Sequence, residues 1–256
     1  RLFWTPPLST RKQKSQRKDW KILLAATLLG MVINMLSFFK GLSLSTPINS
    51  AVLVTITPII VVLLSALFLK EKIGLRKILG IGLGFLGALG LILFGHEIRQ
   101  DAPNIFVGNI LFVLNATSYG AYLIVVKSLI KKYHPITLMK WLFGMAFVIN
   151  FPITIVEFNQ IQWGEMPLEI WAAIGFVIVG TTFLTYLFNA FALTTLKASS
   201  VGAFVYLQPL IGIIYAVLSG KDQLSPVKLA GTLAVLVGVY LATSKQASKS
   251  SEGKTI

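Results

Sequence analysis

Residues 54–87 read VTITPIIVVLLSALFLKEKIGLRKILGIGLGFLG, and 151 positions later residues 205–238 read VYLQPLIGIIYAVLSGKDQLSPVKLAGTLAVLVG. At this single offset, without a gap, the stretches share residues of distinctive type: Pro58 with Pro209, Glu71 with Asp222, and Gly80 with Gly231. Matches between Leu and Val would arise easily by chance, whereas paired Pro, Gly and charged positions indicate an internal repeat. The same offset pairs Trp20 with Trp171, so the repeat extends over most of the chain.

Apolar runs of membrane-spanning length follow one another along the whole chain. Its 256 residues are 55% hydrophobic and 12% charged, whereas a soluble domain has roughly 25% charged residues. A helix crosses the hydrocarbon with about 20 apolar residues. We therefore expect an all-α integral membrane protein with helical spans at residues 21–41, 47–69, 77–95, 105–126, 141–157, 170–192, 199–219 and 227–243. Runs such as Ile59–Leu69 lack the alternation that a β-barrel strand requires.

The formal charge of +14 has two explanations, a nucleic-acid-binding surface or a membrane topology with basic cytoplasmic loops. Eighteen of the 23 Lys and Arg residues lie in one alternating set of predicted loops and tails, and only Arg99 and Lys221 lie in the opposite set. This sorting favours topology, so we expect no nucleic-acid partner. It predicts a multi-pass protein of the inner (plasma) membrane, in contact with the lipid bilayer, with its basic loops and C-terminus in the cytoplasm.

The two copies are predicted to cross the membrane in opposite directions. The first copy starts from the cytoplasmic side at Trp20, and the second starts from the outer side at Trp171. Inverted repeats are a transporter architecture, with the binding site near the midplane between the repeats. Spans 105–126 and 141–157 precede the second copy, and their counterparts would precede Arg1. We therefore expect an inverted-repeat helix bundle of ten spans, of which eight are visible, with residues 1–98 in the first repeat and 99–256 in the second.

Polar side chains inside the predicted spans are the candidates for a substrate site, because each is costly in hydrocarbon. The spacing i, i+3, i+4, i+7 places Asn115, Ser118, Tyr119 and Tyr122 on one helical face, and for this stripe we favour a cavity lining. Other spans contribute further candidates: Asn34, Lys40, Asn189, Tyr206 and Gln208. Thr185 and Tyr186 are also polar. For any single Asn or Ser, hydrogen bonding between packed helices remains the alternative.

Lys40 and two prolines stand out within the apolar runs. Lys40 alone among Lys and Arg is set inside an apolar helix, where it either snorkels to the outer headgroups or provides a cation for a substrate carboxylate or phosphate. Pro58 and Pro209 lie mid-span at equivalent positions, and each removes one backbone hydrogen bond. The prolines either shape helix packing or break the helix beside a central site.

Few residues could support catalysis, metal binding or a cofactor. The chain has no Cys, its two His residues, His96 and His134, are predicted on opposite sides of the membrane, and no predicted span contains a carboxylate suited to burial. We therefore expect no enzyme, no metal and no cofactor. Gly80, Gly84, Gly87 and Gly90 indicate close helix packing, and they leave a homodimer open as a further partner.

The motifs resemble the EamA module of the drug/metabolite transporter superfamily. They are Thr46–Ala51, Thr57-Pro58, Leu69–Lys72, Gly80 and Gly87, and in the second copy Tyr206–Pro209, Gly231 and Gly238. The resemblance covers about residues 20–245 and implies ten spans, cytoplasmic termini, a central cavity and export or exchange of amino acids or related metabolites. We therefore expect a secondary transporter of a small-molecule substrate. The alternative is a non-transporting membrane receptor or scaffold, which would carry no flux.

Overall fold

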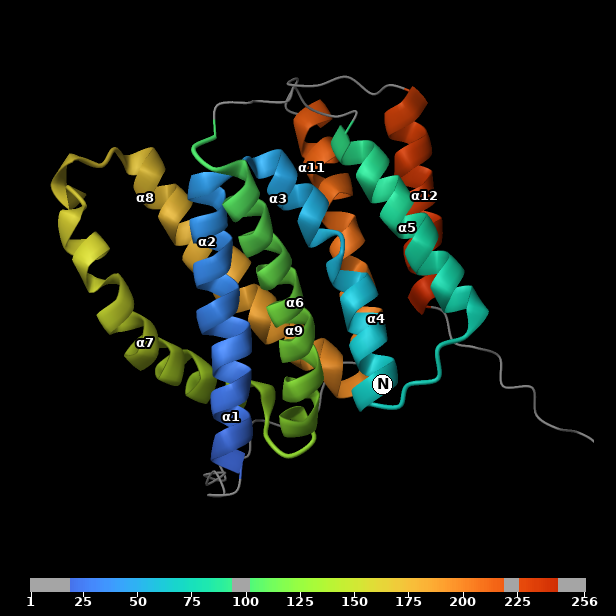
Figure 1. The fold of residues 1–256 in the computed structure, drawn as a ribbon, viewed down its shortest axis with the longest axis horizontal. Coiled ribbons are helices and arrows are strands. Elements are labelled where there is room, and N and C mark those ends of the chain that lie inside the picture. The colour runs from blue at the N-terminus through green and yellow to red at the C-terminus, as the bar shows by residue number, and fades with distance from the viewer. Residues whose placement is uncertain (1–18, 94–101, 219–225, 244–256) are drawn as a thin grey trace, which may run out of the picture.

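The computed structural model describes residues 19–93, 102–218 and 226–243, and every regular element in these ranges is a helix (Figure 1). The first span consists of α1 (Trp20–Thr27), η2 (Leu28–Ile33) and α2 (Asn34–Leu44). The next four are α3 (Pro47–Val54) with α4 (Thr57–Phe68), then α5 (Leu75–Leu93), α6 (Ile105–Ile130) and α7 (Pro135–Gln160). After the short helix η3 (Trp163–Glu165), the sixth consists of α8 (Leu168–Gly175), η4 (Phe176–Leu184) and α9 (Thr185–Thr195). The last two are α10 (Ala198–Ala203), η5 (Phe204–Tyr206) and α11 (Leu207–Leu218), followed by α12 (Pro226–Thr243).

All eight expected spans are helical, which confirms the all-α membrane fold. In the described part of the chain, five helical stretches are long and apolar enough to cross a membrane: Trp20–Leu44, Asn49–Phe68, Ile105–Ile130, Pro135–Gln160 and Leu168–Thr195. The expected bounds of the fifth span, 141–157, were wrong, because α7 has 26 residues and begins at Pro135. Proline is favoured at the first turn of a helix, and the exposed Lys140 continues the helix instead of ending it.

Two irregularities recur in both copies of the repeat. The π-helical segment η2 maps, after a shift of 151 residues, inside the π-helical segment η4. The break between α3 and α4 likewise maps onto the boundary between η5 and α11. Each break lies just before a proline, Pro58 or Pro209, which has no N–H to donate and crowds the carbonyl four residues earlier. The repeat is therefore visible in the local backbone as well as in residue types.

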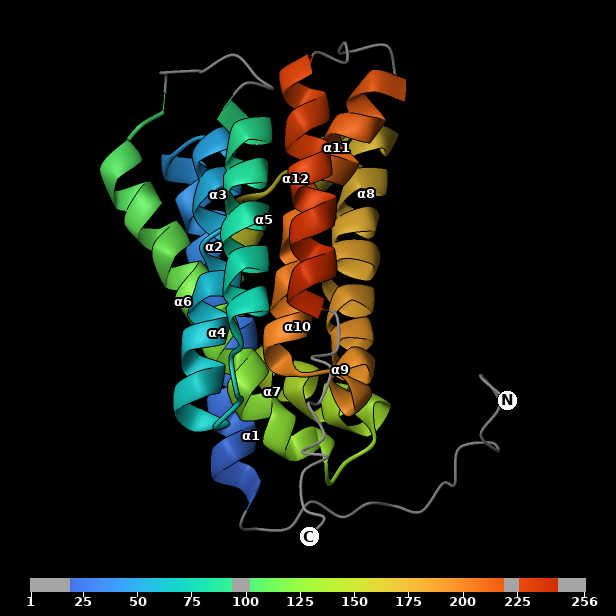
Figure 2. The ribbon, with the colours of Figure 1, turned by 90° about the vertical axis from the view of Figure 1, so that its right-hand side faces the viewer.

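The two copies run in opposite directions through the bundle. Figure 1 shows the first span rising from α1 to α2, and the sixth span descending from α8 to α9. The seventh span rises from α10 to α11, and α12 returns beside α5 in both ribbon views (Figures 1 and 2). This is the inverted arrangement that the charge distribution predicted.

Helices α5 and α12 pack with their backbones in contact. A Cβ atom added at Gly238 would lie 2.5 Å from the Gly84 backbone nitrogen, and one added at Gly80 would lie 2.6 Å from the Ala242 nitrogen. No larger residue fits at these positions without separating the helices. At Gly82 and Gly90 of α5, an added Cβ would meet nothing within 4 Å. Of the glycines expected to pack closely, Gly80, Gly84 and Gly87 meet neighbouring atoms, whereas Gly90 lies on an open face together with Gly82.

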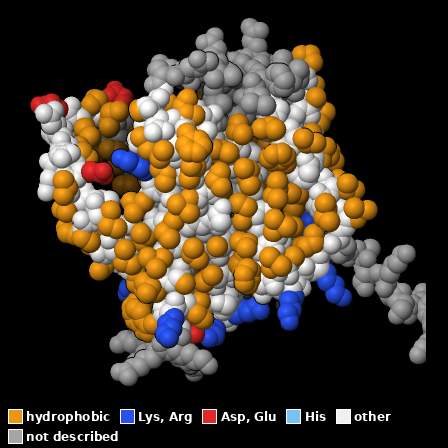
Figure 3. Space-filling model, viewed as in Figure 1, with side chains coloured by type: hydrophobic (Ala, Val, Ile, Leu, Met, Phe, Trp, Pro, Cys, Tyr) orange, Lys and Arg blue, Asp and Glu red, His pale blue; other side chains and the backbone are white. Residues whose placement is uncertain are grey.

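The C-terminal part of α7, after Ala146, and the first part of the sixth span, α8 and η4, contain no buried residues. The buried residues of α7 all lie between Pro135 and Ala146. Figure 1 shows α7 and α8 diverging from the other helices at this end. Hydrophobic side chains cover much of the face in Figure 3, most Lys and Arg gather along its lower edge, and the acidic residues visible at the upper left lie over the α7–α8 end. This surface suits lipid along its length and water at its two ends.

Candidate functional site

Two asparagines form a reciprocal pair where α2 crosses α6. The Asn34 side-chain nitrogen Nδ2 donates to the Asn115 carbonyl oxygen at 3.1 Å, and Asn115 Nδ2 donates to the Asn34 carbonyl oxygen at 2.9 Å. Both side chains are buried. Asn34 is the first residue after the π-helical segment η2, so this irregularity ends where the polar contact begins. The pair fixes the first span against α6 in the interior of the bundle.

Tyr186 of α9 extends this pair to the sixth span. Its buried hydroxyl lies 3.0 Å from Asn34 Oδ1 and also contacts the carbonyl oxygen of Gly30 in η2. The sequence showed a polar residue here, but Tyr186 was not among the expected site residues. The signal that could have identified it is its spacing of three from Asn189, which places both side chains on one face of α9.

Three tyrosines gather around these contacts. The ring centroids of Tyr122 and Tyr186 are 5.4 Å apart, and Tyr119 lies 6.0 Å from Tyr122 and 6.2 Å from Tyr186. Asn189 Nδ2 donates to the Tyr119 hydroxyl at 2.6 Å. The Tyr122 hydroxyl is buried and has no hydrogen-bond partner among the residues the structure describes. We call Asn34, Asn115, Tyr119, Tyr122, Tyr186 and Asn189 the central polar cluster.

The expected stripe on α6 faces neighbouring helices in this conformation. Ser118 Oγ donates to the Leu29 carbonyl oxygen at 2.6 Å. The Tyr122 ring covers Gly30, where an added Cβ would lie 2.4 Å from the ring carbon Cδ2. Most polar atoms of the stripe are thus satisfied by the first and sixth spans, and the Tyr122 hydroxyl is the exception.

The remaining candidates lie apart from the central polar cluster. Lys40 is exposed near the other end of α2. Gln208 is exposed on α11. Tyr206 packs against α5, where a Cβ added at Gly84 would lie 2.6 Å from its ring, and its buried hydroxyl is unpartnered within the described ranges. Pro58 is buried near the start of α4. From their depth in the predicted spans we expect Asn34, Asn115, Tyr119, Tyr206 and Gln208 to converge, and the structure brings the first three of these into the cluster.

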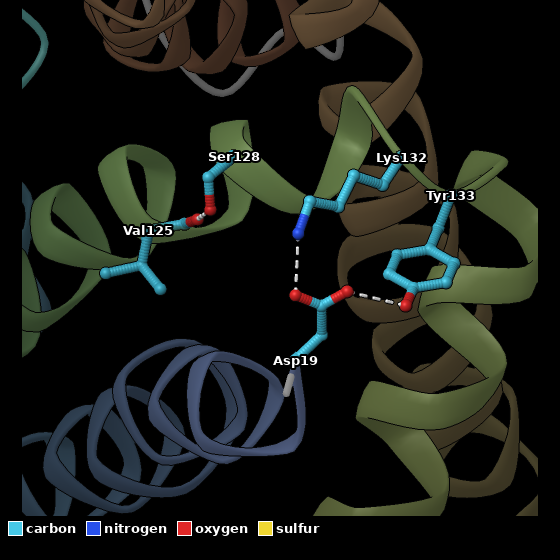
Figure 4. A network of polar contacts seen from close by, with 5 residues as sticks. All are labelled: Asp19, Val125, Ser128, Lys132 and Tyr133. Atoms are coloured by element: carbon cyan, nitrogen blue, oxygen red, sulfur yellow. Dashed lines mark hydrogen bonds and ion pairs between the residues drawn. The ribbon is translucent and has the colours of Figure 1, made fainter. Parts of the chain in front are cut away.

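A second polar network ties the start of α1 to the turn between α6 and α7 (Figure 4). The Asp19 carboxylate, 1% exposed, accepts from Lys132 Nζ at 2.7 Å and from the Tyr133 hydroxyl at 2.8 Å. The hydrogen bond to Asp19 raises the pKa of Lys132, so the ammonium form is favoured. In the same view Ser128 donates to the Val125 carbonyl oxygen within α6. Lys132, in the turn that follows α6, bridges to the first span through its side chain.

In the described ranges, no group of three or more His, Cys, Asp or Glu side chains could hold a metal ion. The central polar cluster offers amide and hydroxyl groups instead. These groups can donate and accept hydrogen bonds.

A sequence profile of the EamA-like transporter family matches residues 2–93 and 106–244. The chain is 22% identical over 235 residues to the uncharacterized transporter YyaM of Bacillus subtilis, covering 91% of this chain and 76% of that protein. It is 25% identical over 247 residues to an uncharacterized transporter of Archaeoglobus fulgidus (96% of this chain, 82% of that one). It is 29% identical over 229 residues to an uncharacterized transporter of Methanothermobacter thermautotrophicus, covering 88% of this chain and 65% of that protein.

A crystal structure, at 15% sequence identity, matches 89% of this chain and 77% of its own chain with a TM-score of 0.72, which shows a shared fold. The family match across both copies of the repeat, the apolar helices and relatives named as transporters together identify a multi-pass membrane transporter. They point away from catalysis as its role. The chain belongs to the EamA-like transporter family.

Proposed function

We propose that the protein is a secondary transporter that exports or exchanges small polar metabolites, amino acids or related compounds, across the inner membrane. It works by alternating access between two inverted repeats, residues 1–98 and 99–256. The observation that carries this proposal is the central polar cluster. Buried amides and hydroxyls are costly in a membrane protein and cluster there mainly for function.

The composition of the central polar cluster favours a neutral or zwitterionic substrate. Its members carry no fixed charge, and the Tyr122 hydroxyl has a free hydrogen-bonding position among the described residues. The bond between Asn189 and Tyr119 joins two helices through side chains alone, so a substrate can replace it without breaking a helix. Amide and hydroxyl groups in a low-dielectric interior bind a polar solute more strongly than they would in water.

Lys40 supplies a positive charge at the outer mouth. It is exposed near the end of α2 that is remote from the basic end of the bundle. A substrate carboxylate entering from that side would meet this ammonium before reaching the amides of the cluster. Tyr206 and Gln208 lie on the seventh span and would take part when the repeats move relative to one another.

The basic end of the bundle is assigned to the cytoplasm. Lys21, Lys70, Lys131 and Lys140 lie at helix ends on this side, and α12 runs toward it. Positive residues accumulate in cytoplasmic loops, so the C-terminus belongs in the cytoplasm. The partners are the lipid bilayer and the small-molecule substrate, and a homodimer would use the open face of α5 at Gly82 and Gly90.

Flux into proteoliposomes tests the role of the central polar cluster. Asn189→Leu removes the bond to Tyr119 and should lower the rate of amino-acid exchange about tenfold or more, while the protein stays monodisperse. Thr194→Ala on the same helix is the matched control, because Thr194 is exposed and donates only to the Phe191 carbonyl oxygen of its own turn. Equal flux in both variants would assign the cluster to packing.

A further inference from the structure

Charged side chains from three elements surround the break between α9 and α10 at the basic end. Lys127 of α6 donates to the carbonyl oxygens of Leu193 and Leu196, in the last turn of α9 and just beyond it. These carbonyls have no partner within their own helix, and a cation is the favourable group at such an end. The C-terminal end of the sixth span is therefore held by α6.

The start of the seventh span is held by the connection between α4 and α5. Glu71 Oε1 accepts from the Ala198 backbone N–H at 3.2 Å, and Glu71 Oε2 accepts from Ser199 Oγ. Lys77 of α5 donates to Ser199 Oγ at 2.7 Å and reaches Ser200 Oγ at 3.4 Å. Ser199, 0% exposed, therefore bridges a carboxylate and an ammonium group. Hydrogen bonds to ionised groups are roughly twice as strong as neutral ones.

The contacts of Glu71 and Lys77 with Ala198 and Ser199 join the two predicted repeats, whereas the contacts of Lys127 lie within the second repeat. Glu71 and Lys77 belong to residues 1–98, whereas Lys127, Ala198 and Ser199 belong to residues 99–256. The shift of 151 residues maps Glu71 onto Asp222 and Lys77 onto Lys228, so the sequence places an acid and a base at the opposite end too. Asp222 lies outside the described residues. If this end opens by moving α10 away from the connection between α4 and α5, the contacts of Glu71 and Lys77 must break.

We propose that Glu71, Lys77 and Ser199 form a latch that closes the basic, cytoplasmic end of the protein and breaks each time this end opens. The latch rests on the proposed alternating access. It holds the seventh span, whose own helix is interrupted at η5, against α5 and the connection between α4 and α5. Removal of the Glu71 charge weakens the contacts to Ala198 and Ser199 together, and thus favours the conformation open to the cytoplasm.

Thiol labelling tests the latch without knowledge of the substrate. Residues 1–256 contain no Cys, so within them Ala198→Cys is a single reporter at a position that is 0% exposed. A membrane-impermeant maleimide on the basic side of oriented vesicles should label it roughly tenfold faster in Glu71→Gln, since a charge-assisted hydrogen bond is lost. Lys72→Gln, an exposed neighbour outside these contacts, should leave the rate unchanged.

A second reporter separates opening from unfolding. Ala88→Cys is 0% exposed between α5 and α12 and should stay unreactive in both backgrounds. If Glu71→Gln exposes both reporters, the variant has unfolded, and the milder Ser199→Ala is judged by the same criterion. An unchanged Ala198→Cys rate in folded Glu71→Gln and Ser199→Ala, or an equal rise with Lys72→Gln, would overturn the latch.

The same experiment keeps the latch distinct from the transport proposal. Labelling that rises only from the basic side supports the latch even where no flux is found, whereas flux without any change in labelling refutes the latch alone. A bifunctional thiol cross-linker between Glu71→Cys and Ser199→Cys should stop flux reversibly. Full flux in the cross-linked protein would show that these residues need not separate.

Discussion

The central polar cluster shows how side chains of one type serve two purposes at the scale of a residue. Asn34 and Asn115 each donate to the other's backbone carbonyl, so their amide groups replace bonds that water would supply outside the membrane. Asn189 and Tyr119 instead pair through side chains. The first pair is suited to holding helices together and the second to being exchanged for a substrate.

Asn115→Leu should therefore destabilise the protein by about 1–2 kcal/mol, since it leaves the Asn34 carbonyl oxygen buried without its donor. The free energy of unfolding, measured by denaturant titration in detergent, checks this. Thr117→Ala is the control on the same helix, because Thr117 is exposed and donates to the Val113 carbonyl oxygen. Equal stability of the two variants would contradict the structural role of the pair.

Lys40→Met should lower transport of a carboxylated substrate far more than it lowers expression. The ammonium is exposed on α2 away from the other described cations, so its removal costs little packing but removes the attraction for an anionic group. Lys21→Met at the basic end serves as the control. Flux normalised to inserted protein is the measurement, and wild-type flux in Lys40→Met would assign this residue to snorkelling.

At the scale of an element, the sequence predicted which segments are helical spans better than it predicted where each helix ends and which helices pack against one another. The eight apolar runs predicted eight helical spans because length and hydropathy suffice for that. Lys140 was taken as a boundary of the fifth span, yet α7 continues through it, since a long cationic side chain near a helix end can reach water. Length and hydropathy contain no signal for the two π-helical segments, so these were not predicted.

Helix neighbours explain why part of the site escaped prediction. Tyr186 and Tyr206 are both buried tyrosines at mid-span, but Tyr186 reaches Asn34 whereas Tyr206 packs on Gly84. Hydropathy gives the depth of a residue and not the helix that its face meets. The stripe on α6 was found because its spacing defines a face within a single helix.

The close contact of α5 and α12 predicts an asymmetric response to glycine substitutions. Gly238→Val places side-chain atoms where Cβ alone would lie 2.5 Å from the Gly84 nitrogen, so it should cost about 1–3 kcal/mol or prevent folding. Gly82→Ala, with nothing within 4 Å of the added Cβ, should be tolerated. Thermal unfolding monitored by size-exclusion chromatography compares them, and equal melting temperatures would argue against this packing.

At the scale of the whole molecule, the distribution of charged residues and the directions of the helices both fit two copies of a repeat that are inverted in the membrane. The described Lys and Arg side chains lie mostly at one end of the bundle, and the acidic Glu157, Glu165 and Glu169 lie around the α7–α8 connection at the other end. The helices of the two copies run in opposite directions. Inverted repeats are the symmetry on which the proposed alternating access rests.

Single cysteines at Ser248 and Gln162 should label from opposite sides of sealed vesicles. The basic end is assigned to the cytoplasm, and Gln162 lies in the α7–α8 connection at the other end. An impermeant thiol reagent applied to right-side-out and inverted vesicles reads the two positions separately. Labelling of both cysteines from one side would refute the topology.

Solute counterflow tests the central claim of transport most directly. Protein expressed from its complete reading frame would be reconstituted into liposomes loaded with unlabelled amino acids, and a panel of radiolabelled amino acids would be added outside. The account predicts transient accumulation of at least one labelled compound above that of protein-free liposomes, and its loss in Asn189→Leu but not in Thr194→Ala. Correctly inserted, monodisperse protein that accumulates no member of the panel would contradict the proposed transport of amino acids.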